Sequence, residues 1–138
     1  RVTKPDFASL TTGALDTNVY NVVPRSVPAI TASTTLTAQD DGALVVFNTT
    51  STVTVTLPAT AKNMTFDFYV QVAAASTQLH SISPAAADKI FCIGFTSVDD
   101  KDAQNTQATA AIGDGFHLVG DGTDGWFGTK FGTWAIES

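Results

Sequence analysis

The chain has 138 residues, the size of a single domain that buries about two-thirds of its unfolded surface. Only 14% of the residues are charged, and a net charge of −6 argues against nucleic acid as a partner, because phosphate neutralisation needs clustered Lys and Arg. No apolar run reaches membrane-spanning length, so no membrane partner is expected, and the single cysteine, Cys92, excludes an intrachain disulfide.

The first 28 residues differ from the rest. Three bases and two acids give them a charge of +1, whereas four bases and eleven acids give residues 29–138 a charge of −7. Pro5, Pro24 and Pro28 disfavour both a helix and a central strand. The segment is nevertheless too apolar for a solvated tail, so we expect an extended N-terminal arm, residues 1–28, that docks on its own chain or on a neighbour. Its expected partner-binding residues are Phe7, Leu10, Val19, Tyr20, Val22 and Val23.

Residues 29–138 carry strand signals, beginning with runs at 34–38 and 43–48. The Asp41-Gly42 pair between them predicts a hairpin. In the next run apolar residues alternate with Thr from residue 52 to 57, and Pro58 ends it, because proline has no N–H for a β ladder. A further period-2 run covers 65–72. Together these runs predict an antiparallel meander with one buried face.

The second half continues with short runs at 79–83 and 89–93, and the polar segment 97–106 is expected to be a loop. Four more runs, 109–112, 116–119, 126–129 and 133–136, alternate with Gly-rich turns. Many short strands with closely spaced turns predict an all-β domain, a compact antiparallel β-sandwich or barrel of jelly-roll or tulip-like form.

The loop at 120–125, Gly-Asp-Gly-Thr-Asp-Gly, is the best candidate for chemistry. Asp121 and Asp124 could offer oxygen ligands to calcium, but the spacing fits no EF-hand loop. Asp and Gly are also the residues that tight turns prefer. We therefore expect a turn, and no metal or cofactor.

Four aromatic residues crowd the last thirteen positions: Trp126, Phe127, Phe131 and Trp134. An exposed row of rings could stack on sugars, as in carbohydrate-binding modules. Alternation along a strand instead sends some rings into the core and others toward solvent or a partner. We favour core and interface, with Trp126 buried.

His80 and His117 are the two histidines, and neither has a second ligand at metal-binding spacing. The HExxH and GxSxG motifs do not occur, although a Ser-His-Asp triad assembled in space stays open. We expect no enzymatic activity.

A set of short motifs runs through residues 30–138. They include a Val-Thr-Leu-Pro-Ala strand end, a Phe-x-Phe strand and late Asp-Gly turns before a tryptophan. The matching segments are Thr37 with Asp41-Gly42, Val46-Phe47-Asn48, residues 53–59 and 66–70, Asp88-Lys89-Ile90, Gly113-Asp114-Gly115, residues 118–122, and Trp126. This set resembles the head-decoration (capsid cement) proteins of tailed bacteriophages and related fibre domains.

The resemblance implies a non-enzymatic virion protein, made in the host cytoplasm and located on the capsid surface. It implies a homotrimer that stabilises the shell by binding the lattice of the major capsid protein, with the N-terminal arm in contact with that protein. Two other classes remain open: a phage fibre or receptor-binding domain, and a carbohydrate-binding module.

Overall fold

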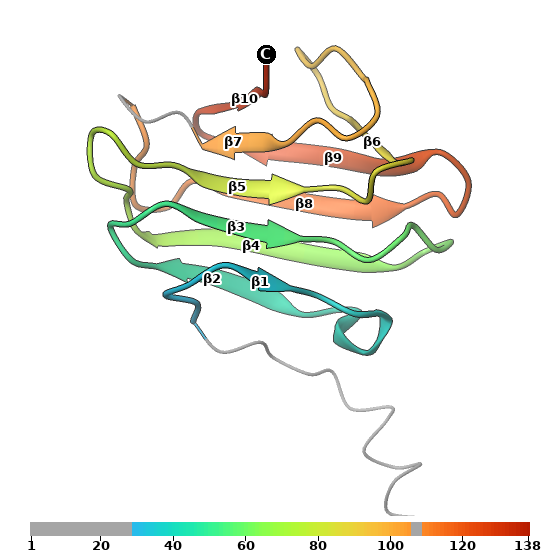
Figure 1. Cartoon of the computed structure of the whole chain (residues 1–138), viewed down its shortest axis with the longest axis horizontal. Helices are drawn as coiled ribbons and strands as arrows, with labels where there is room; N and C mark the ends of the chain where they lie inside the picture. Colours follow the sequence, from blue (N-terminus) through green and yellow to red (C-terminus); the bar gives the residue numbers. More distant parts are fainter. Residues whose placement is uncertain (1–28, 106–108) are drawn as a thin grey trace, which may run out of the picture.

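Two five-stranded β-sheets form a sandwich in the computed structural model, which describes residues 29–105 and 109–138 (Figure 1). The first sheet has the order β1 (Thr34–Thr35), β3 (Val53–Thr56), β5 (His80–Ser83), β7 (Ala103–Asn105) and β10 (Trp134–Ile136). The second has the order β2 (Leu44–Asn48), β4 (Thr65–Val72), β8 (Gly115–Gly120), β9 (Gly125–Phe131) and β6 (Lys89–Phe91). The predicted all-β sandwich is thus confirmed, and the barrel alternative is not what forms.

Helix is confined, within the described ranges, to one short 3-10 turn, η1 (Ala38–Asp40). None of the helical structure found there is long and apolar enough to cross a membrane.

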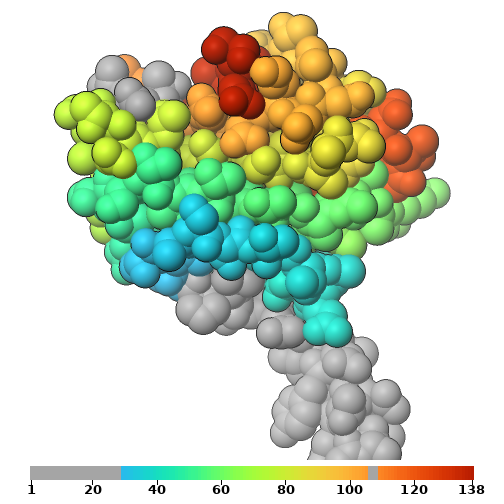
Figure 2. Space-filling view, viewed as in Figure 1, coloured from blue at the N-terminus to red at the C-terminus, as the bar shows by residue number. Residues whose placement is uncertain are grey.

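The chain changes sheet at every step from β1 to β8, and among the described strands only β8 and β9 follow each other within one sheet. Successive turns of this winding place β1, β3 and β5 side by side and parallel, and likewise β2 and β4. The strand order appears in Figure 2 as bands of colour that run from blue to orange-red across the molecule. The sheets are therefore mixed, and the expectation of a wholly antiparallel meander over residues 42–72 was wrong.

The predicted hairpin at Asp41-Gly42 does not form either, because its two runs belong to different sheets. After β1 the chain still follows β3, with the N–H of Leu36 donating to the carbonyl of Thr56 (2.8 Å), and then turns through η1. Asp41 and Gly42 instead form hydrogen bonds that join the segment before β2 to the start of β4. The Asp41 carboxylate accepts from the N–H of Thr65 (2.7 Å), and the Gly42 N–H donates to the Thr65 carbonyl (2.8 Å).

Two loop assignments also differ. Ala103–Asn105 forms β7 inside the segment predicted as a polar loop, because pairing with both β5 and β10 buries Ala103 and Asn105 completely. No strand forms at residues 109–112, which were expected to make one.

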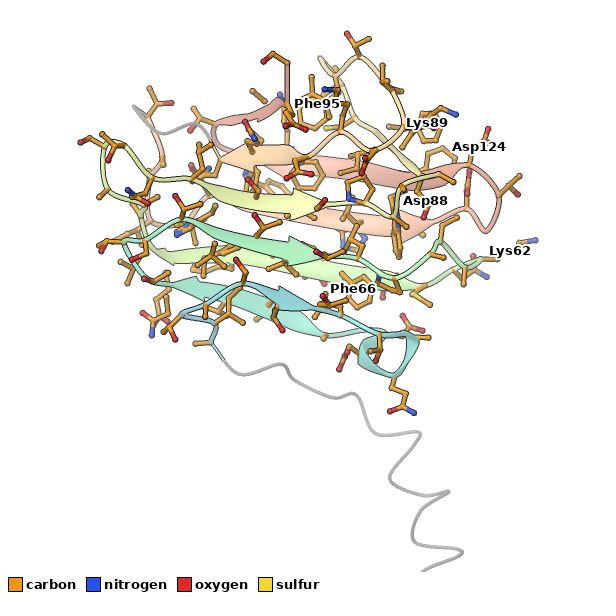
Figure 3. The ribbon with its side chains drawn as sticks, in the orientation of Figure 1. Lys62, Phe66, Asp88, Lys89, Phe95 and Asp124 are labelled. Carbon is orange, nitrogen blue, oxygen red and sulfur yellow. The ribbon has the colours of Figure 1, made fainter. Side chains whose placement is uncertain are left out.

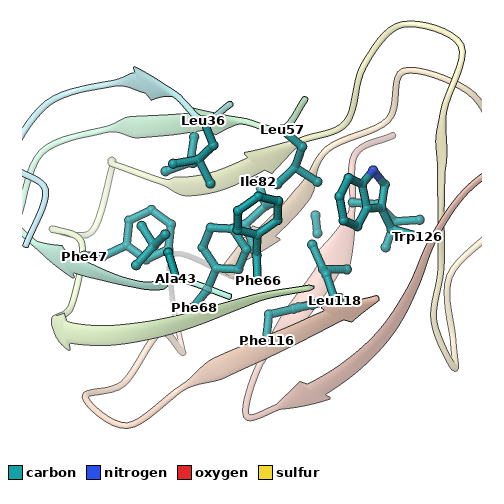
Figure 4. Close-up of a cluster of buried hydrophobic side chains, with 14 of the residues drawn as sticks. Leu36, Ala43, Phe47, Leu57, Phe66, Phe68, Ile82, Phe116, Leu118 and Trp126 are labelled. Atoms are coloured by element: carbon teal, nitrogen blue, oxygen red, sulfur yellow. The ribbon is translucent and has the colours of Figure 1, made fainter. Parts of the chain in front are cut away.

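The core fills the space between the sheets with the alternate residues of each strand (Figure 4). Phe66 and Trp126 pack with ring centroids 5.6 Å apart, and the Phe116 ring meets Trp134 edge to face at 5.3 Å. Trp126 is fully buried, as predicted. Cys92 is half-buried and packs against this core.

Candidate functional site

The two outer faces of the sandwich differ in chemistry. In the first sheet the outward positions of β3, β5 and β7 carry small hydroxylated or amide side chains, which the register places next to one another. We call this the hydroxyl face: Thr35, Thr54, Thr56, Ser81, Ser83 and Gln104. These six residues are neither aromatic nor charged, but the Asp102 carboxylate lies beside them and forms a hydrogen bond with Ser83.

The outer face of the second sheet is apolar and aromatic. Tyr69, Phe127 and Phe131 project from β4 and β9, with 43%, 57% and 59% of each residue exposed. Folded domains usually scatter large exposed apolar residues, whereas here several share one sheet face. We call this surface the aromatic face: Leu44, Val46, Tyr69, Phe91, Val119, Phe127 and Phe131.

Strand register sorts the aromatic face into rows across the sheet. One row joins Val46, Tyr69 and Phe131, with Gly115 between the two rings. A side-chain carbon at Gly115 would approach the Phe68 carbonyl at 3.0 Å and the Phe131 ring at 3.8 Å, so the Phe131 ring covers this glycine.

A second row joins Val119, Phe127 and Phe91, four strand positions away from the first. The rings of Phe91 and Phe127 pack together with centroids 5.6 Å apart. The two apolar rows thus lie on either side of a polar one, which sits in the middle of the sheet.

Asp67, His117 and Thr129 form that middle row, one residue from each of three adjacent strands. Nδ1 of His117 lies 2.5 Å from a carboxylate oxygen of Asp67, and both side chains remain partly exposed, at 39% and 53%. The pair offers hydrogen-bonding groups to a partner between two rows of apolar and aromatic side chains, on a face that also carries Thr65 and Lys89.

Carboxylate, imidazole and hydroxyl in one row have the composition of a catalytic triad, but their surroundings do not suit acyl transfer. Among the described residues no hydrogen bond joins Thr129 to His117. Oxyanion stabilisation needs backbone N–H groups that are available to the substrate. Because β8 lies between β4 and β9, the ladders on both sides use its N–H groups. The row therefore fits binding better than catalysis.

The loop at 120–125 is the turn of the β8–β9 hairpin, as its composition predicted. One oxygen of Asp121 accepts from the N–H groups of Thr123, Asp124 and Gly125, at 2.7, 2.9 and 2.9 Å. These bonds, that of Gly125 first, hold the pKa of Asp121 below its usual value.

Near that turn, Lys89 forms an ion pair with Asp99 at 3.2 Å, and Figure 3 shows Lys89 and Asp124 at the same end of the sandwich. In residues 29–105 and 109–138 no three His, Cys, Asp or Glu side chains come together as a metal site. The carboxylate of Asp121 is engaged in holding its own turn.

The histidines and tryptophans that the sequence analysis singled out do not come together in one site. His80 lies inside the sandwich and is fully buried, whereas His117 lies on the aromatic face. Trp134, like Trp126, is a core residue, so neither tryptophan is presented to a sugar. The six predicted partner-binding residues of the arm, Phe7 to Val23, lie outside the described residues.

Sequence reasoning missed the aromatic face as a unit. Period 2 indicated that Phe127 and Phe131 point away from Trp126, but Tyr69 and Phe91 join them only through strand pairing. Asp67 and His117 are fifty positions apart and meet in the same way. A match to a known protein could have supplied that pairing, but comparison with protein-family models and with curated proteins found none.

Proposed function

We propose that this protein is a non-enzymatic virion structural protein that decorates a phage capsid and stabilises it by binding the lattice of the major capsid protein. The observation that carries the proposal is the aromatic face, an apolar surface on one side of a sandwich whose other side is hydroxylated. The resemblance of the 30–138 motifs to capsid cement proteins adds the class of partner.

The size of the aromatic face favours a partner met in many copies. Five strands about 4.8 Å apart and a seven-residue β9 give a footprint of about 20 Å by 20 Å, or roughly 400 Å². A stable one-to-one complex usually buries about 800 Å² on each partner. One such contact is therefore weak, and a repeating lattice, a trimer and an additional contact from the arm raise the overall affinity by multivalency.

The working complex in this proposal is a homotrimer at the virion surface, assembled after synthesis in the host cytoplasm. Residues 29–138 have a charge of −7, so the complementary patch on the shell is expected to be apolar with a neutral or basic rim. The arm, with its charge of +1, binds a second and more acidic part of the lattice.

The experiment compares two double variants for co-sedimentation with mature, decoration-free phage shells. Phe127→Ser with Phe131→Ser removes two rings that are more than half exposed, so the fold should be retained. Burial of the rest of each ring contributes about 1–2 kcal/mol, so the pair should weaken binding at each site by roughly 30-fold or more.

The matched control is Thr54→Ala with Thr56→Ala, on the opposite face, and it should bind like the parent. Equal binding by all three proteins would refute the role of the aromatic face. Binding by none, the parent included, would refute the capsid-decoration proposal.

A fibre or receptor-binding role is the second candidate, and the Asp67–His117 pair between aromatic rows favours it. Sugar-binding sites combine aromatic stacking with polar groups that bind hydroxyls. If the parent ignores shells but binds host cells, and Phe127→Ser with Phe131→Ser abolishes that binding, this candidate replaces the first.

A further inference from the structure

His80, the first residue of β5, is an uncommon histidine because it is fully buried inside the sandwich. Its ring lies flat on that of Phe47, with centroids 4.7 Å apart and planes 6° from parallel. Its Nε2 lies 2.9 Å from the carbonyl oxygen of Thr49. A carbonyl only accepts, so the proton of the neutral ring is on Nε2, and Nδ1 is an acceptor.

Within residues 29–105 and 109–138 that Nδ1 has no hydrogen-bond partner, and neither does the buried Oδ1 of Asn105. The two residues are direct cross-strand partners on β5 and β7. The amide nitrogen of Asn105 points elsewhere and donates to Asp114 at 2.8 Å and to the Thr133 carbonyl at 2.9 Å. The neutral core thus holds two unpaired acceptors at one level of the sandwich.

The described groups that face His80 offer no charge to balance a proton. β2 contributes Phe47, β3 contributes Val53 and β7 contributes Asn105. Asp114 is the first carboxylate beyond Asn105, and its Oδ2 already accepts from Asn105, from the Ala111 N–H and from the Thr133 hydroxyl.

Burial consequently lowers the pKa of His80 below its usual 6.5, and the bond to the Thr49 carbonyl opposes this only in part. An imidazolium at this position would be a buried charge without a counter-ion, which is strongly unfavourable.

The bond from His80 to Thr49 also links β5 to the loops at one end of the sandwich. Thr49 belongs to the turn between β2 and β3, and this turn binds the connection between β4 and β5. The Ala75 N–H donates to the Thr50 carbonyl (2.8 Å), and the Thr52 N–H donates to the Gln78 side chain (3.0 Å). Both segments, 49–52 and 73–79, therefore depend on the strand end that His80 occupies.

We propose that His80 is an acid-sensitive latch, and that its protonation opens the end of the sandwich formed by residues 49–52 and 73–79 while the opposite end stays closed. This inference does not depend on the proposed function. The open form hydrates the imidazolium, which the closed form cannot do. The open form therefore binds the proton more tightly than the closed form. The free energy that favours the closed form is greatest above pH 6.5, and it decreases as the pH falls from there toward the folded-state pKa.

Amide hydrogen exchange of the full chain tests the latch, in a His117→Gln background that leaves His80 as the one histidine. Reporters at the His80 end are Val53 and Ala75, whose N–H groups bond to Leu79 and Thr50. Reporters at the other end are Leu57 and Gly120, bonded to Ser83 and Met64. Protection factors, which correct for the intrinsic pH dependence of exchange, are compared between about pH 7 and pH 5, where histidine titrates.

The latch predicts that protection of Val53 and Ala75 falls about tenfold for each pH unit below 6.5, down to the folded-state pKa, while Leu57 and Gly120 keep theirs. His80→Gln should remove this dependence. If that variant does not fold, the His117→Gln protein alone still tests the latch. The pH dependence of protection is then compared with the titration of the His80 ring, followed by NMR. Constant or rising protection in acid, or an equal loss at both ends, would overturn the proposal.

Discussion

Replacement of Trp126 by Ala tests the packing of the core most severely. Trp126 is fully buried, its ring packs on Phe66, and its register partner on β8 is Gly120, which has no side chain to move into the space. Replacing a buried Trp by Ala destabilises a protein most when the cavity that remains cannot collapse. We therefore expect a loss of about 4–5 kcal/mol in the free energy of unfolding, in the upper part of the range for such replacements. For a chain of this length that corresponds to a fall of roughly 12–20 °C in Tm.

Trp126→Phe provides the comparison. The buried indole N–H of Trp126 has no hydrogen-bond partner in the part of the chain that the structure describes. This variant therefore loses volume but no observed hydrogen bond, and a loss of about 1–2 kcal/mol in the free energy of unfolding is expected. Trp134→Phe should lose a hydrogen bond as well as volume, because the Trp134 N–H donates to the Phe131 carbonyl at 3.2 Å. Urea unfolding followed by circular dichroism measures all three. A loss below about 1.5 kcal/mol for Trp126→Ala would refute the packing argument.

Three further predictions concern a turn, a glycine and the arm. Asp121→Ala should lower the urea midpoint more than Asp121→Asn, because the amide oxygen still accepts from the turn. Since the pKa of Asp121 is lowered, its stabilising contribution is present above the ordinary Asp pKa and fades as the pH falls through the folded value, so Asp121→Asn should flatten the acid limb of stability against pH. Calcium should leave the Tm of the parent unchanged, and a rise would contradict the turn assignment. Gly132→Ala should cost about 2–3 kcal/mol, since its Cβ would collide with the Asp114 carboxylate. Gly42→Ala has the same φ of +81° but open space around it, so only about 1 kcal/mol of backbone strain is expected, and equal costs would contradict the collision. Deletion of residues 1–28 should leave the β domain folded, by circular dichroism, but greatly weaken co-sedimentation with shells, and undiminished binding would show that the body alone makes the contact.

The local pattern of the sequence predicted the strands but not their partners. Alternation in 53–57 and 65–72 correctly gave β3 and β4 and the residues they bury, because side chains alternate along any strand. The same alternation occurs in parallel and antiparallel ladders, so it could not show that β2 pairs with β4 in parallel. Pairing is decided by contacts between distant segments.

Turn chemistry was informative at one Asp-Gly site and misleading at another. At Asp121 the carboxylate accepts from three N–H groups of its own loop, so a local signal produced a local hairpin. At Asp41 the carboxylate accepts from Thr65, twenty-four positions away, and the glycine adopts a positive φ for a sheet-crossing turn. The residue types are the same, and the difference lies in what the fold brings near them.

The candidate site was the least predictable part. Phe127 and Phe131 could be assigned outward from the alternation that buries Trp126. They share a surface with Tyr69 and Phe91 only because β4, β8, β9 and β6 follow one another in the sheet. A surface assembled from five strands has no signature in any one of them.

Electron cryomicroscopy of mature shells mixed with the full chain tests whether the aromatic face binds the capsid. We expect ordered density over the shell lattice, with the sheet of β2, β4, β8, β9 and β6 turned toward the shell and Phe127 and Phe131 in the contact. Density with the hydroxyl face against the shell, or shells that stay bare at saturating protein, would contradict it.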